Sequence, residues 1–289
     1  MTIGQRPTVR RRRLRSELRQ RREDAGLTQE QVAGEMEWSL SKLVRIEAGT
    51  VGISTNDLRA LLSLYGLRER EHVEELLELA RAARQRMWWT SYKNTLGPAY
   101  LEFIGFVAEA STIRYFHPMV VPGLLQTEDY ARAVITDGAT GVLEPEDIDA
   151  RVDIRMTWIN DVLGRPEPPT FLVVLDEAVI RRRVGGAAVM RAQLRHLAAL
   201  AGEPYMRIAV VPFTAGAHPG LYGSFALLEF TDPADDTILY LENAPTDMIL
   251  RDRPTEISRY AVAFDRLVDT ALAPEETIAV LTEAADSID

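Results

Sequence analysis

The sequence contains no cysteine among its 289 residues. That absence excludes disulfide bonds, thiolate-bound zinc and cysteine nucleophiles. It also lacks any apolar run approaching the roughly 18 residues that a membrane-spanning helix requires, so we expect no transmembrane segment. The basic N-terminal stretch is not followed by an apolar segment, which argues against a secretory signal. We therefore expect a cytoplasmic protein.

Histidine is scarce as well, with four residues at positions 72, 117, 196 and 218 and neither HxH nor HExxH spacing. A metal site would have to be assembled from distant side chains. Neither of the two common glycine-rich phosphate loops occurs. The pair Asp176-Glu177 follows a predicted strand, where catalytic acids can lie, but it equally suits a helix N-terminus, where acids are stabilised by the helix dipole. We favour the second interpretation and expect no catalytic residues, no metal, no cofactor and no enzymatic activity.

Charge is distributed unevenly. The whole chain carries a net charge of −10. Residues 1–70 contain 14 basic and 9 acidic residues, a net charge of +5, whereas the remainder carries −15. Nine arginines lie between Arg6 and Arg22. An acidic remainder would repel nucleic acid, so we expect any DNA contact to be confined to the N-terminal part.

The stretch from Leu27 to Gly49 predicts two short helices joined by a tight turn. Thr28 is suited to cap the first helix. The second begins at Ser39 or Leu40 and ends at Gly49, a residue typical of helix C-termini. This spacing is that of a helix-turn-helix, whose second helix enters the major groove of DNA.

The residues LTQEQVA (27–33), Ser41, Ile46-Glu47 and Gly49 resemble the lambda-repressor-like, or xenobiotic-response-element, family of bacterial regulators. The resemblance implies that Glu47 ties the second helix to the body of the domain. The sequence departs from the family at the turn, where Glu37-Trp38 replaces the usual small residue or glycine.

The same resemblance implies a set of DNA contacts. Leu40, Ser41 and Arg45 would contact base edges. The side chain of Arg45 suits this role, since arginine can bind guanine through two hydrogen bonds. Phosphates would be contacted by Gln29 and Lys42. The basic run Arg11, Arg12 and Arg13 adds phosphate or minor-groove contacts if it forms an ordered arm, although a solvated tail is the alternative for residues 2–11.

Several phrases in the rest of the chain resemble a C-terminal domain of unknown function found in actinobacterial regulators, over roughly residues 95–280. They are VPGLLQTEDYARAV (121–134), VLDEAVIRRRVGG (174–186), QLRHL (193–197), GAHPGLYGSFALLEF (216–230) and DRPTEISRYAVAFDRL (252–267). The resemblance implies a transcription regulator, often paired in an antitoxin-like arrangement with a small protein encoded nearby. Residues 156–159, MTWI, are less polar than that pattern.

The fold class we predict is mainly α with α+β: an all-α, five-helix helix-turn-helix head followed by a larger α+β domain with a small mixed sheet. We place a basic arm at residues 1–11, the DNA-binding domain at 12–68, a helical linker at 69–94 and the α+β domain at 95–289. Short runs rich in Val, Ile, Leu and Phe predict its strands. These are Phe171–Leu175, Arg207–Val211, Ser224–Phe230 and Thr237–Leu241, the last two as a hairpin.

Three residues of the second domain are candidates for a ligand pocket: His218 and Tyr222, in a glycine-rich loop, and Arg182, in a basic cluster. The alternative for the loop is a long hairpin turn, and the alternative for the arginines is a solvated helix face. We favour both alternatives over a role in a ligand pocket. We expect a homodimer on a double-stranded DNA operator, because one recognition helix buries little surface. The apolar helix after Gly66 and the last two helices are candidate dimer surfaces. The second domain would bind a small protein or, alternatively, a small-molecule effector.

Overall fold

The computed structural model describes residues 7–49, 51–82, 87–93, 95–138, 141, 143–232, 236–242, 248–250 and 253–288. The chain divides into two compact units, Met1–Thr90 and Ser91–Asp289. We call the first unit the head and the second the body. None of the helices in the described ranges is both long enough and apolar enough to cross a bilayer.

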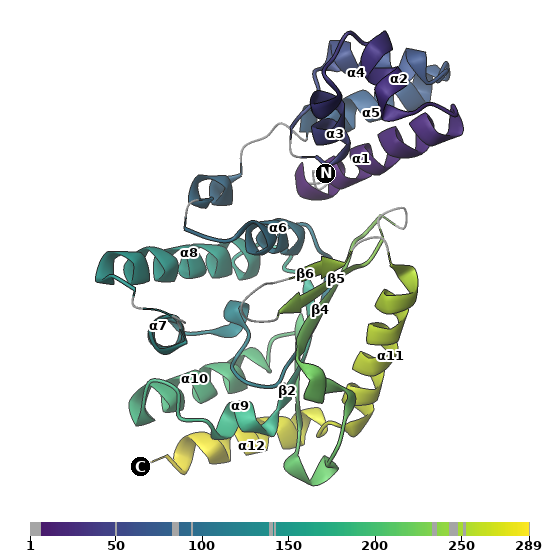
Figure 1. Ribbon diagram of the computed structural model, residues 1–289. Helices are drawn as coiled ribbons and strands as arrows, with labels where there is room; N and C mark the ends of the chain where they lie inside the picture. Colours follow the sequence, from purple (N-terminus) through teal and green to yellow (C-terminus); the bar gives the residue numbers. More distant parts are fainter. Residues whose placement is uncertain are drawn as a thin grey trace. The chain divides into compact units, whose positions relative to one another are not determined.

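Within its described residues, the head has five α-helices, as predicted (Figure 1). They are α1 (Pro7–Asp24), α2 (Gln29–Glu35), α3 (Leu40–Glu47), α4 (Thr55–Leu64) and α5 (Arg70–Ala82). Their apolar stripes converge on one core, whose most buried members include Leu18, Val32, Leu43, Leu58 and Leu77. A short 3-10 helix, η1, spans Trp88–Tyr92.

The elements of the head begin and end at other residues than the predicted boundaries at two places. Helix α1 begins at Pro7, so residues 7–11 are helical rather than part of an arm, while residues 1–6 of the predicted arm lie outside the described residues. Helix α5 packs against α1 and α4, and its Leu76 and Leu77 are buried in the head's core. Because α5 buries its apolar stripe inside the head, it is neither a linker nor an open dimer surface.

The body is built on a mixed sheet of six strands in the order β3-β2-β1-β4-β5-β6. The strands are β1 (Thr112–His117), β2 (Thr170–Asp176), β3 (Met206–Val211), β4 (Ser224–Glu229), β5 (Ile238–Glu242) and β6 (Met248–Leu250). Strands β1, β2 and β3 are parallel to one another, whereas β4, β5 and β6 each run antiparallel to the strand before them in this order. The predicted mixed sheet is thereby confirmed, and so is the β4–β5 hairpin.

Strands β1 and β6 are not among the four strands predicted from the sequence. Strand β1 lies at the centre of the sheet, where parallel β2 and antiparallel β4 flank it. The glycine-rich loop 216–223 is not a hairpin turn, because β3 and β4, which it connects, are separated by β2 and β1. One 3-10 turn, η3 (Phe213–Ala215), precedes the loop, and a second, η4 (Pro219–Tyr222), lies within it.

Helices cover both faces of this sheet (Figure 1). The body's helices are α6 (Pro98–Val107), α7 (Glu128–Asp137), α8 (Pro145–Leu163), α9 (Glu177–Arg181), α10 (Ala187–Leu200), α11 (Pro254–Thr270) and α12 (Pro274–Asp286), with a 3-10 turn η2 at Gly123–Leu125. Helix α11 packs on one face, where its Phe264 and Leu267 join Phe116 and Phe225 in a core. On the opposite face Phe103 of α6 stacks on Tyr240, with ring centroids 3.9 Å apart.

A polar cluster lies on the α6 side of the sheet. The Tyr115 hydroxyl donates to Glu242 Oε2 over 2.7 Å, and His117 Nε2 lies 3.6 Å from the same oxygen. The backbone N–H groups of Met119 and Val120 donate to His117 Nδ1, so Nε2 carries the proton that faces Glu242. Burial alone would raise the pKa of Glu242, but the contacts with His117 and Tyr115 bring that pKa below its ordinary value of 4.5.

Candidate nucleic-acid interface

Helix α2 starts with a reciprocal cap. Thr28 Oγ1 accepts from the backbone N–H of Gln31 over 3.2 Å, and the Gln31 side-chain oxygen accepts from the backbone N–H of Thr28 over 2.9 Å. Two of the backbone donors at the helix start are satisfied in this way. The cap sets where α2 begins and so directs Val32 and Ala33 into the core.

The turn between α2 and α3 requires a left-handed residue, and the sequence supplies Glu37, with φ 54°. A residue with a Cβ atom is strained in this region. The turn is closed by the N–H of Trp38, which donates to Ala33 O over 2.8 Å. Trp38 itself packs against the head's core. The departure at Glu37-Trp38 therefore leaves a tight turn in place.

Helix α3 presents one face to the core and another to solvent. Ser39 caps it, accepting from the backbone N–H of Lys42 over 3.3 Å. Leu43 and Ile46 are buried. The residues that remain exposed follow helical spacing and form what we call the α3 outer face: Leu40, Ser41, Val44 and Arg45. Leu40 and Val44 are each 40% exposed, although both are apolar.

The three residues predicted to read bases are thus brought onto one surface, and Val44 joins them. Sequence reasoning missed Val44, although its position one turn after Leu40 was the available signal. Arg45 Nε donates to Ser41 O over 3.2 Å, which holds the start of its guanidinium group along the helix. Apolar side chains beside an arginine suit the edges of bases, since thymine offers a methyl group and guanine two acceptors.

Lys42 lies at the edge of this face. Its ammonium group is 3.8 Å from the centroid of the Trp38 ring and 3.4 Å from Asp57 Oδ2. A cation over an indole face is attracted by the ring. These contacts orient the ammonium group of Lys42. To bind a phosphate, this group must either break its contact with Asp57 or bind both groups at once.

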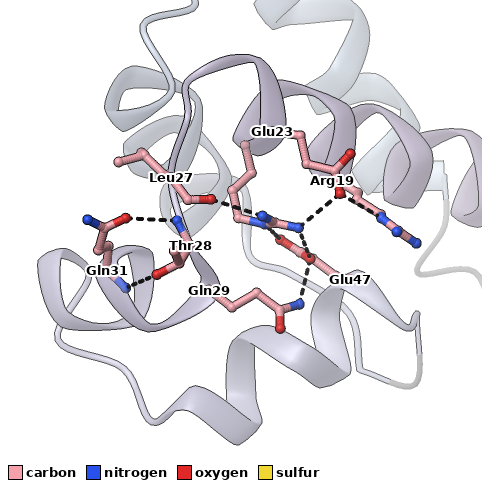
Figure 2. Close-up of polar contacts among 8 residues, drawn as sticks. Arg19, Glu23, Leu27, Thr28, Gln29, Gln31 and Glu47 are labelled. Carbon is pink, nitrogen blue, oxygen red and sulfur yellow. Dashed lines mark hydrogen bonds and ion pairs between the residues drawn. The ribbon is translucent and has the colours of Figure 1, made fainter.

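Glu47 ends α3 and connects three helices (Figure 2). Arg22 of α1 donates through Nε to Oε1 over 2.8 Å and through Nη2 to Oε2 over 3.3 Å. The Glu47 and Arg22 side chains are only 5% and 11% exposed. The hydrogen bond with Glu47 raises the pKa of Arg22. This nearly buried pair matches the structural role that the resemblance implied for Glu47.

Gln29 turns toward the same carboxylate, and Figure 2 shows the two side chains pointing at each other. Its Nε2 donates to Glu47 Oε2 over 2.8 Å. This side chain was predicted to contact a DNA phosphate. The structure instead commits its amide group to positioning α3 against α2.

The arginine run of α1 also divides by environment. Arg12 is 6% exposed, so we withdraw it from the phosphate contacts. Arg13 pairs with Glu75 of α5 over 2.7 Å. Arg11 keeps an exposed side chain. Helical geometry separates the three, because neighbours along a helix point in directions about 100° apart.

The three predicted pocket residues of the body are not brought together. Tyr222 is 95% exposed and lines a cavity of about 260 Å³ that neither His218 nor Arg182 lines. His218 Nε2 lies 3.1 Å from Asp176 Oδ2, and the histidine side chain is 4% exposed. Arg182 is exposed at the end of α9.

The acidic pair at the end of β2 has structural partners. Asp176 caps α9, accepting from the N–H of Ala178 over 2.8 Å. Glu177 accepts from the N–H of Phe213 over 2.8 Å and pairs with Arg181. Within the described ranges, no group of three or more histidine and acidic side chains is placed to hold a metal ion.

Comparison with known protein families agrees with the division of the chain into a head and a body. Residues 13–76 match a helix-turn-helix domain, so the head belongs to a class of DNA-binding regulatory domains. Residues 100–283 match the family described as "Domain of unknown function (DUF5753)". That match covers more than half of the chain, and the protein belongs to this family. No curated protein and no solved structure matches the chain.

Proposed function

We propose that the protein is a sequence-specific transcription regulator of the cytoplasm that binds a double-stranded operator as a homodimer. The observation that carries this proposal is the α3 outer face, where Arg45, Ser41, Leu40 and Val44 lie exposed on a helix that Glu47 anchors to α1 and α2. A rigidly held helix with an arginine and small apolar groups on its free face suits the major groove.

For the body we propose a binding role without catalysis, in which it recognises a small protein in an antitoxin-like pair. The body, residues 91–289, contains 16 basic and 30 acidic residues, and its net charge of −14 suits a basic partner. The engagement of Asp176 and Glu177 in helix and loop contacts supports the non-catalytic interpretation. A second candidate function is sensing of a small molecule, which is favoured by a cavity of about 210 Å³ that α6, α7 and α8 line within the body.

The DNA-binding proposal is tested by selecting binding sites from a random DNA pool with the full chain, then measuring affinity for the selected site. Arg45→Ala should weaken binding by about 1–3 kcal/mol and relax the preference at one base position. The matched control is Arg59→Ala, which removes an exposed arginine of α4 that pairs with Glu74. An Arg45→Ala protein with an unchanged base preference would contradict our assignment of the reading face.

A further inference from the structure

The body contains a cavity of about 210 Å³ on the α6 side of the sheet. Helices α6, α7 and α8 and the residues just before α6 line it. Its walls are mostly apolar and aromatic, and the lining residues are Leu96, Gly97, Tyr100, Ile104, Ile135, Arg151, Ile154, Arg155 and Trp158. The volume equals that of about seven water molecules, at roughly 30 Å³ each. The cavity is therefore suited to a small molecule rather than to a peptide.

Two arginines enter this apolar site from the same face of α8, because Arg151 and Arg155 are four residues apart. Arg155 is already engaged, since its Nη1 donates to Gln126 Oε1 over 2.5 Å and its charge also acts on Glu242. Arg151 is different. Its Nε atom is buried and has no hydrogen-bond partner among the described residues.

Trp158 and Tyr100 form an aromatic wall of the cavity. Trp158 is 1% exposed, and its ring meets that of Tyr100 edge to face, with centroids 5.9 Å apart. Aromatic side chains contribute large apolar contact areas. This wall therefore suits the apolar part of a ligand.

We propose that this cavity binds a small organic carboxylate whose apolar part is an aromatic ring or a short branched chain. The carboxylate would accept from Arg151, and the apolar part would lie against Tyr100, Trp158 and the isoleucines. Guanidinium groups bind carboxylates strongly, particularly where water is excluded. The proposal deepens the second candidate function by naming the ligand class, and it places the site away from His218, Tyr222 and Arg182.

The test is calorimetric titration of the full chain with benzoate, without DNA. Benzamide is the neutral probe of the same shape, and inorganic phosphate is the anion without an apolar part. Benzoate should bind saturably, with benzamide and phosphate at least tenfold weaker. Arg151→Gln should weaken benzoate at least tenfold. The matched control, Arg195→Gln, removes an exposed arginine of α10 that pairs with Asp286, and it should bind benzoate like the original chain.

A second variant guards against a folding defect in the first. Ile135→Phe adds volume at the cavity wall without changing charge, and it should also weaken benzoate while the thermal transition is retained. The proposal is overturned if the original chain does not bind benzoate, if benzamide or phosphate binds as well, or if Arg151→Gln binds it unchanged. Operator affinity is measured separately on the same preparations, so failure of the ligand site is distinguished from failure of DNA recognition.

Discussion

The head and the body differ in how far apart in the sequence their working residues lie. In the head, the α3 outer face spans six consecutive positions, Leu40 to Arg45, and helical spacing alone separates it from the buried Leu43. In the body, the cavity joins Leu96 to Trp158 across three helices and a loop. A surface on one helix follows from local periodicity, whereas a cavity requires the packing of distant segments.

The two units also place their arginines differently. In the head, Arg22 of α1 is nearly buried against Glu47, and this ion pair connects α1 to α3. In the body, Arg151 of α8 lines an apolar cavity. Hydrogen bonds between a guanidinium group and a carboxylate are strong, so the first arrangement suits a structural contact and the second suits a site for an anionic ligand.

The largest effect is expected at the Arg22–Glu47 ion pair of the head. Glu47→Ala leaves the nearly buried guanidinium of Arg22 without its carboxylate, and should lower the free energy of unfolding of the head by about 3–5 kcal/mol. Urea denaturation of the full chain, followed by hydrogen exchange, would localise the loss. Because Gln29 also donates to Glu47, operator binding should fall with it. The control is Glu23→Ala, which removes an exposed carboxylate beside the same arginine and should change little. If the Glu47→Ala protein were as stable as the original chain, the Arg22–Glu47 ion pair would not stabilise the head.

In the body, the corresponding test is steric. A Cβ atom on Gly220 would lie 2.1 Å from the ring of Phe116, which is completely buried. Gly220→Ala should therefore destabilise the body by about 1–3 kcal/mol, as overpacking does. Gly141→Ala is the matched control, since nothing lies within 4 Å of the added atom. Thermal unfolding of both variants measures the difference, and indistinguishable transitions would mean that Gly220 does not lie against the Phe116 ring.

A smaller effect of opposite sign is expected at the turn. Glu37→Gly relieves the left-handed strain of about 1–2 kcal/mol but adds chain entropy to the unfolded state. The net result should stabilise the head by about 0.5–1 kcal/mol. Glu35→Gly, two residues earlier and inside α2, should instead cost about 1 kcal/mol. If chemical denaturation showed that both variants are destabilised, this result would contradict the left-handed conformation of Glu37.

The last expected effect is limited to acidic pH. A carboxyl group whose pKa is lowered in the folded state contributes stability above its ordinary pKa, and loses it as the pH falls through the folded value. For Glu242 this contribution is complete above about pH 4.5 and disappears below it. Glu242→Gln should therefore be less stable than the original chain at neutral pH, with the difference closing on acidification. Denaturation curves across this range check the sign, and a difference that grows toward acid would contradict it.

Much of the head was predictable because its signals act over a few residues. Thr28 and Ser39 cap helices through backbone groups three positions later, and Gly49 follows α3 with φ 72°. The inward turn of Gln29 and the burial of Arg12 were not predictable. Both depend on which neighbouring helix approaches, and a polar residue looks the same in the sequence whether it faces solvent or a buried partner.

In the body, four strands were predictable from their apolar content, but β1 and β6 were not predicted. The loop 216–223 was taken for a hairpin turn because its glycines suit one, while the structure uses it to connect strands that are not neighbours. The three pocket residues predicted there were chosen by chemistry alone. The cavity formed elsewhere, from residues whose apolar character made them look like ordinary core.

The amino-acid sequence by itself therefore determined the two-part plan, the position of the helix-turn-helix and the outward residues of its second helix. These follow from helical period, capping chemistry and uneven charge, all of which act over short stretches of chain. Only the tertiary structure decided which arginine is buried, which carboxylate holds α3 and where the body leaves an apolar cavity beside Arg151. Those outcomes depend on packing between segments far apart in the chain, and a linear pattern carries no record of which surfaces meet.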